Sequence, residues 1–295
     1  MIYISAVGMI NALGNNLDDI AANLTRGVAP GMRPRAGWLQ GHPQAVLAGV
    51  DGELPVIPEK FAAHRSRNNQ ILLAALAQIQ PQVDDAIAKY GRERIAIVLG
   101  TSTSGLHEGD THVNLRTHGQ PSTTWHYAQQ ELGDPSRFLS HWLALDGPAY
   151  TLSTACSSSA RAMISGRRLI EAGLVDAAIV GGADTLSRMP INGFHSLESL
   201  SPTLCQPFGR DRAGITIGEG AGLMLLTREP QPIALLGVGE SSDAYHISAP
   251  HPRAKAQFAP LTRRWLMRSL RRMRWAISTC TAPPHNSTTR LNRWW

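Results

Sequence analysis

The sequence predicts an α/β protein, because apolar runs of strand length alternate with segments of helical periodicity. Residues 95–99 form a continuous apolar run, which is typical of a strand covered on both faces. Residues 69–90 carry apolar side chains at helical spacing, which indicates an amphipathic helix. A strand, a tight turn, a helix and a second strand follow one another over residues 148–180. With 295 residues, the chain is long enough for a sizeable core.

The N-terminal part opens with a strand over residues 1–9. A helix over 17–24 follows, with Asn16 as its N-cap. Residues 27–55 are rich in Gly and Pro and are expected to be mostly loop. The periodicity of 69–90 predicts one long helix that leads into the strand at 95–99.

The second part contains a predicted βαβ unit. A short buried strand over 148–152 leads through small residues into a helix that ends at Gly173, and 177–180 is the next strand. Such a unit implies a right-handed crossover and a parallel pair of strands. Further strands are expected at 223–226 and 233–238.

Cys156 lies where the strand at 148–152 gives way to the helix. At a helix N-terminus a thiol meets unsatisfied N–H groups and the positive end of the helix dipole, which favours the nucleophilic thiolate. The alternative is a small apolar residue buried in a tight turn. The spacing alone leaves both interpretations open.

The charge of the chain is unevenly distributed. The formal net charge is +6, which by itself favours a nucleic-acid or anionic-membrane partner. Residues 253–295, however, hold ten of the 28 Lys and Arg residues, no Asp or Glu, and four of the seven Trp residues. Without them the chain is mildly acidic, so we expect no nucleic-acid partner for the globular part.

Cysteine usage and hydropathy indicate the compartment. The three cysteines, Cys156, Cys205 and Cys280, show no metal-type or C-x-x-C spacing, which fits a reducing environment. The N-terminus has no signal-peptide pattern, and no apolar run approaches the roughly 20 residues that span a bilayer. We therefore expect a cytoplasmic protein without a membrane partner.

Five motifs in order resemble those of one family. They are AVGMINALG at 6–14, TACSSSA at 154–160, VGGAD at 180–184, QPFGRDRAG at 206–214 and GEGAG at 218–222. Together they resemble the N-terminal half of β-ketoacyl-[acyl carrier protein] synthases, the condensing enzymes of fatty-acid and polyketide synthesis. The resemblance extends to about Pro252.

The resemblance implies a fold, a reaction and partners. The fold is the N-terminal half of a thiolase-like fold, with a mostly parallel central sheet and helices on both faces. Cys156 is implied to take an acyl group as a thioester, after which a malonyl thioester loses CO₂ and its carbanion attacks the acyl carbon. The partners implied are an acyl carrier protein, its acyl and malonyl thioesters, and a second copy of the chain in a homodimer. No cofactor or metal is implied.

The family's two histidine motifs and its late glycine-rich loop are not readable after Pro252, and His285 has no matching context. Back-translation of residues 279–289, read one base out of register with permitted third bases, gives H-G-T-A-T-Q-L-N-D, which resembles the first histidine motif. We therefore interpret residues 1–252 as the synthase N-terminal domain. Residues 253–295 are interpreted as a poorly structured tail, out of frame after one lost nucleotide near codon 252, in a truncated and impaired chain.

Other polar residues have structural interpretations. Glu219 is expected to be a hydrogen-bonding carboxylate rather than a catalytic base. A metal site at His107, Glu108 and Asp110 is not expected, because nothing completes a ligand set. His246 and His251 are expected to be structural or to contact substrate.

Two alternative functions stay open. One is a non-catalytic ketosynthase partner that resembles a chain-length factor, although such subunits usually lack the nucleophile. The other is a nucleic-acid-binding module that acts through the basic tail.

Overall fold

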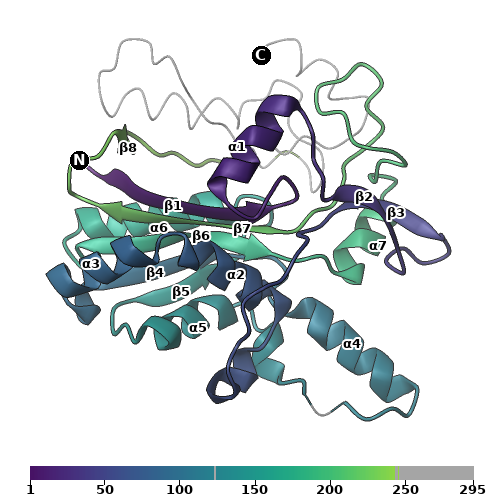
Figure 1. Ribbon diagram of the computed structural model, residues 1–295, viewed down its shortest axis with the longest axis horizontal. Coiled ribbons are helices and arrows are strands. Elements are labelled where there is room, and N and C mark those ends of the chain that lie inside the picture. Colours follow the sequence, from purple (N-terminus) through teal and green to yellow (C-terminus); the bar gives the residue numbers. More distant parts are fainter. Residues whose placement is uncertain (123, 243–244, 246–295) are drawn as a thin grey trace.

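The computed structural model describes residues 1–122, 124–242 and 245 (Figure 1). Its strands are β1 (Tyr3–Asn11), β2 (Met32–Ala36), β3 (Gln44–Ala48), β4 (Ile95–Gly100), β5 (Ala149–Leu152), β6 (Ala177–Asp184), β7 (Gly220–Thr227) and β8 (Ile233–Ala234). Its α-helices are α1 (Leu17–Arg26), α2 (Arg67–Ala77), α3 (Gln80–Tyr90), α4 (Leu106–Thr117), α5 (Asp134–Leu143), α6 (Ser158–Glu171) and α7 (Arg188–Ser196). Short 3₁₀ helices are η1 (Glu59–His64), η2 (Arg92–Arg94) and η3 (Tyr127–Gln130).

A six-stranded sheet of order β5-β4-β6-β7-β1-β8 forms the centre of the molecule. β4 pairs in parallel with β5 and β6, whereas the pairs β6–β7, β7–β1 and β1–β8 are antiparallel. The α/β class is confirmed, but the sheet is mixed rather than mostly parallel. The reason is that β7 starts opposite the end of β6, where Gly220 faces Asp184, and runs back along it.

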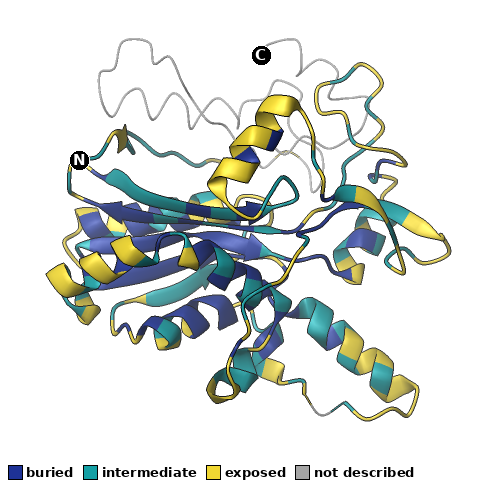
Figure 2. Cartoon of the chain, in the orientation of Figure 1, coloured by how far each residue is buried: buried dark blue, intermediate teal, exposed yellow. Residues whose placement is uncertain are grey.

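Helices cover both faces of this sheet, as expected (Figure 1). On one face α2, α3 and α5 pack a large apolar core against alternate residues of the strands, including Ile97, Ile179 and Leu223. On the other face α6 packs Ala162 and Ile170 against the opposite side chains of β4 and β6. Both faces of β4 and β6 are therefore buried, which explains their continuous apolar sequences (Figure 2).

Several predicted elements form as expected. α1 begins after Asn16, whose side chain accepts the N–H of Asp19 at 2.9 Å. α6 is followed by Gly173 in the left-handed region, with φ 72°. β5 and β6 are parallel and joined by α6, but β4 lies between them. β5 is a half-buried edge strand rather than a fully buried one.

Three predictions need correction. The single helix over 69–90 is two helices, because Pro81 in the first turn of α3 lacks an N–H and fits a helix start. The segment 27–55 contains the β2–β3 hairpin. The strand predicted at 233–238 is only the two residues of β8.

The tail at 253–295, with Cys280 and His285, lies outside the described residues, as do His246 and His251. No helix in the described part of the chain is long and apolar enough to cross a membrane.

Candidate active site

Cys156 lies in the five-residue turn between β5 and α6. Ser157 is the N-cap of α6, so the cysteine immediately precedes the cap, and its side chain is exposed. The predicted position between strand and helix is confirmed. The interpretation of Cys156 as a buried small residue is wrong.

The residue before the cysteine has a strained backbone. Ala155 has φ 53°, in the left-handed region that residues with a Cβ rarely adopt. Such conformations persist only where the surroundings enforce them, and they are frequent at functional sites. This sharp turn holds Cys156 at the surface instead of directing it into the core.

Ser158 fixes the turn from inside. Its buried hydroxyl accepts the N–H of Thr154 at 2.8 Å and donates to the carbonyl of Ala155 at 2.6 Å. The Ser157 hydroxyl donates to the carbonyl of Thr154 at 2.8 Å. The serines next to Cys156 therefore supply hydrogen bonds that maintain the strained turn. Because they are small, they also leave space around the thiol.

Two glycines allow the first turn of α6 to approach the ends of the parallel strands. A Cβ on Gly100, at the end of β4, would lie 2.4 Å from the carbonyl carbon of Ser158. A Cβ on Gly182, in β6, would lie 2.3 Å from the carbonyl oxygen of Gly100 and 2.4 Å from the hydroxyl oxygen of Ser159. This close packing at Gly100 and Gly182 places Cys156 at the carboxyl edge of β4 and β6.

Asp184 ends β6 at the same edge. Its Oδ1 accepts hydrogen bonds from the loop that follows β4, formed by residues 101–104 and called the β4 loop below. The residue is part of the motif at 180–184, but its local sequence predicts no role for it. Its partners lie about 80 positions away in the sequence, so no local pattern indicates them.

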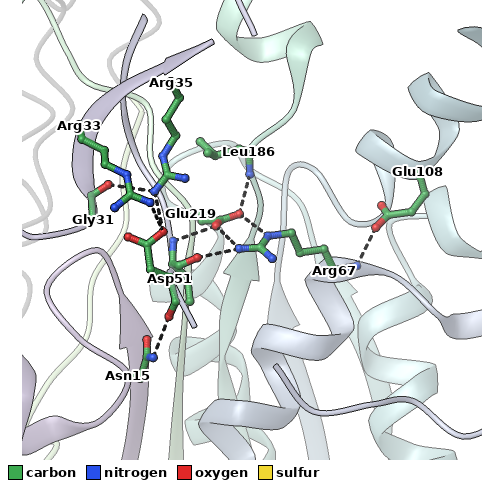
Figure 3. A network of polar contacts seen from close by, with 10 residues as sticks. Asn15, Gly31, Arg33, Arg35, Asp51, Arg67, Glu108, Leu186 and Glu219 are labelled. Carbon is green, nitrogen blue, oxygen red and sulfur yellow. Dashed lines mark hydrogen bonds and ion pairs between the residues drawn. The ribbon is translucent and has the colours of Figure 1, made fainter. Parts of the chain in front are cut away.

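Glu219 is the centre of a second polar network (Figure 3). Its side chain is 2 % exposed and accepts hydrogen bonds from the backbone N–H groups of Val50 and Leu186, at 2.8 and 3.3 Å. The guanidinium of Arg67 donates to both carboxylate oxygens, at 2.6 and 3.0 Å, and also to the carbonyl of Val50. Glu219 is thus a structural carboxylate, as expected, and the hydrogen-bonded carboxylate raises the pKa of Arg67 above its usual range.

The acidic residues at the start of α4 have structural partners. Glu108 accepts the backbone N–H of Arg67 at 2.7 Å and so caps the start of α2, and Asp110 lies 3.7 Å from Arg188. Within the described residues no three His, Cys, Asp or Glu side chains gather as metal ligands. Cys205 is half-buried in a loop, and its N–H donates to Thr216.

A groove of about 430 Å³ lies elsewhere, between α3 and α5 on the outer helical layer. Its lining includes Asp84, Arg92 and Trp142, and does not include Cys156.

The mixed central sheet with helices on both faces is a thiolase-like fold, and comparisons with known proteins agree. The family model of the β-ketoacyl synthase N-terminal domain matches residues 1–231. The chain therefore belongs to the β-ketoacyl synthase family.

Individual relatives give the same answer. Nodulation protein E of Rhizobium meliloti is 35% identical over 117 residues, which are 37% of this chain and 29% of that protein. 3-Oxoacyl-[acyl-carrier-protein] synthase 2 of Staphylococcus aureus strain COL is 25% identical over 274 residues, with 86% of this chain and 66% of that protein covered.

A solved structure is more similar. The structure of a ketosynthase (ApeO) in complex with its chain length factor (ApeC) from Xenorhabdus doucetiae matches with a TM-score of 0.86 and 70% identity. The match covers 88% of this chain and 65% of that one. The chain thus spans less than two thirds of the length of these relatives.

Proposed function

We propose that the chain carries the acyl-accepting part of a β-ketoacyl-[acyl carrier protein] synthase, with Cys156 as the nucleophile. The observation that carries this proposal is the exposed thiol on a strained turn directly before α6. The N-terminal N–H groups and dipole of that helix favour negative charge on the sulfur. Membership of the family supports the same assignment.

The proposed step is a thioester exchange. The Cys156 thiolate attacks the carbonyl carbon of an acyl thioester, a new C–S bond forms, and the carrier's thiolate leaves and takes up a proton. The N–H groups of Ser157 and Ser158 donate to the carbonyls of Thr154 and Ala155, so the backbone N–H of Cys156 itself is the candidate to stabilise the oxyanion of the tetrahedral intermediate. The subsequent decarboxylative condensation needs the two histidines that the family resemblance assigns to its second half.

Acylation of Cys156 tests the proposal. The protein is incubated with an acyl-[acyl carrier protein] or acyl-coenzyme A thioester, and its peptides are analysed by mass spectrometry. We expect the peptide that contains Cys156 to gain the acyl mass, and the gain to disappear in Cys156→Ala. Cys205→Ala is the matched control and should be acylated like the wild type. A label on Cys205, or no label at all, would contradict the assignment.

A non-catalytic partner of a ketosynthase is the second candidate, favoured by the complex of the ApeO ketosynthase with its chain length factor. β5 adds a structural observation, since within the described residues only β4 pairs with it and its outer edge is open. We propose that this edge pairs with a second ketosynthase-type chain. Light scattering of the purified protein, alone and with such a chain, measures this association. Complex formation without acylation of Cys156 would favour the partner role.

We also propose that residues 253–295 are out of frame. Their basic, Trp-rich composition, which differs from the rest of the chain, supports this proposal. Sequencing of the DNA around codons 250–256 tests it. We expect one missing nucleotide, and an intact reading frame would refute the proposal.

A further inference from the structure

We propose that Asp184 is a positioning residue for Cys156. It fixes the β4 loop, which is bonded to the end of the strand that leads to the thiol, and so sets how a thioester carbonyl reaches the sulfur. The inference deepens the proposed function and rests on it.

A single carboxylate oxygen organises the β4 loop. Oδ1 of Asp184 accepts the backbone N–H groups of Ser102 and Thr103 at 2.7 and 2.9 Å. It also accepts the hydroxyl protons of Thr101 and Thr103 at 2.9 and 2.8 Å. A carboxylate makes stronger hydrogen bonds to such donors than a neutral acceptor does. The negative charge therefore matters as well as the geometry.

The two threonine hydroxyls extend the effect of the carboxylate. Because both donate to Asp184, their oxygen lone pairs accept backbone N–H groups. The Thr101 hydroxyl accepts the N–H groups of Thr103 and Ser104, at 3.3 and 3.0 Å. The Thr103 hydroxyl accepts the N–H of Thr185 at 3.1 Å. Loss of the carboxylate would leave these hydroxyls without their acceptor.

The loop held in this way includes a strained residue. Ser104 is buried and has φ 45°, a conformation that favours glycine. Its hydroxyl lies 3.0 Å from the carbonyls of Gln129 and Glu131. A strained loop relaxes when its restraints are removed.

Movement of the loop would reach both sides of Cys156. The N–H of Thr101 donates to the carbonyl of Leu152, the last residue of β5, at 3.3 Å. Gly100, directly before the loop, approaches Ser158 and Ser159 too closely to carry a side chain. Thr101 of the β4 loop is thus bonded to the strand before the cysteine, and Gly100, the residue before the loop, packs against the helix after the cysteine. A misplacement of about 1 Å at a reacting centre can lower the rate about a hundredfold.

The test compares Asp184→Ala and Asp184→Asn with Asp176→Asn in the full-length protein. Asp176 is the matched control, because it precedes the opposite end of β6 and pairs with Arg94 at 2.8 Å. Two rates are measured for Cys156 by mass spectrometry. Acylation by an acyl thioester depends on the orientation of the substrate carbonyl, whereas alkylation by iodoacetamide needs an accessible and ionised thiol but no such orientation. Circular dichroism and thermal melting show whether each variant is folded.

We expect acylation to fall about tenfold in Asp184→Ala and less in Asp184→Asn, with alkylation within about twofold of the wild type. Asp176→Asn should match the wild type in both rates. Equal acylation in folded Asp184→Ala and wild type would overturn the inference while leaving the proposed function intact. A wild-type protein that takes no acyl group would overturn both.

If Asp184→Ala does not fold, the variant Thr103→Val tests the inference instead. It removes one hydroxyl between Asp184 and Thr185 and keeps the volume. A fall in acylation of about threefold with unchanged alkylation supports the inference, and unchanged acylation refutes it.

Discussion

At the scale of single residues, two acidic side chains near the carboxyl edge of the sheet join separate segments of the chain by hydrogen bonds. Asp184 connects the ends of β4 and β6, and Glu219 connects the segments after β3 and β6 to the start of α2. Each accepts backbone N–H groups from segments that are distant in the chain. Buried N–H groups are costly to leave unpaired, so these carboxylates stabilise the packing of the segments that they join.

Removal of the charge on Glu219 should be costly. Glu219→Gln leaves the guanidinium of Arg67, which is one-third exposed, without its buried partner. Breaking a buried pair by changing one member costs about 3–5 kcal/mol, and the partial exposure of Arg67 lowers our expectation to about 2–4 kcal/mol. Urea unfolding followed by circular dichroism measures the loss.

Glu59→Gln is the control, because the Glu59 carboxylate is 86% exposed and bonds to exposed Arg65. Its effect should stay below about 1 kcal/mol. Equal losses in the two variants would show that the network around Glu219 does not stabilise the fold.

Sequence reasoning located Cys156 correctly because the signal is local: a short apolar run, small residues, then helical spacing. It did not find Asp184 or Arg67. Their partners lie in distant parts of the chain, and a hydrogen bond between residues 80 or 150 positions apart leaves no trace in either local pattern.

At the scale of elements, the sequence-based prediction of helices and strands was wrong where the local pattern fits two structures. Apolar periodicity continues through α2 and α3, since Ile79 and Val83 are buried like the residues before them, so only Pro81 indicates the break. β2 contains Arg33, Pro34 and Arg35 and pairs only with β3. Three of the five residues of β2 are exposed, so this strand needs no alternating apolar residues and its sequence resembles a loop. β3 differs, because it buries Leu47.

Ion pairs join the segment after β8 to α6. Glu240 bonds to Arg161 at 2.6 Å and lies 3.3 Å from Arg168, one helical heptad further on. The hydrogen bond from Arg161, together with the positive charge of both arginines, lowers the pKa of Glu240. The folded state therefore favours the carboxylate more than the unfolded state does.

This contribution should depend on pH with a definite sign. Because the folded pKa of Glu240 is the lower one, its stabilisation is fully present above the unfolded pKa and is lost as the pH falls through the folded pKa. We expect Glu240→Gln to lower the free energy of unfolding by about 0.5–1 kcal/mol at pH 7. The difference from the wild type should vanish at acid pH.

Denaturant titrations of both proteins across that pH range test this expectation. The exposed carboxylate of Glu53 supplies a control variant, Glu53→Gln. A difference between Glu240→Gln and the wild type that persists unchanged at low pH would exclude the ion pairs as its cause.

At the scale of the whole molecule, the class and the layers followed from the sequence, whereas the sheet order did not. Buried runs such as 95–99 fix which strands are central, because a strand covered on both faces has no polar side. The apolar run at 223–226 predicts a strand, but its sequence does not indicate whether that strand runs parallel or antiparallel to β6. That direction depends on where the preceding connection ends.

The open outer edge of β5 has one more consequence. Leu152 closes that strand, and the thiol follows four positions later, so any neighbour that extends the sheet there also stiffens the peptide leading to the sulfur. Assembly at this edge, as proposed above, would then alter the reactivity of Cys156. A monomer and an assembled form of this chain should differ in reactivity even if no residue of the neighbour touches the acyl group.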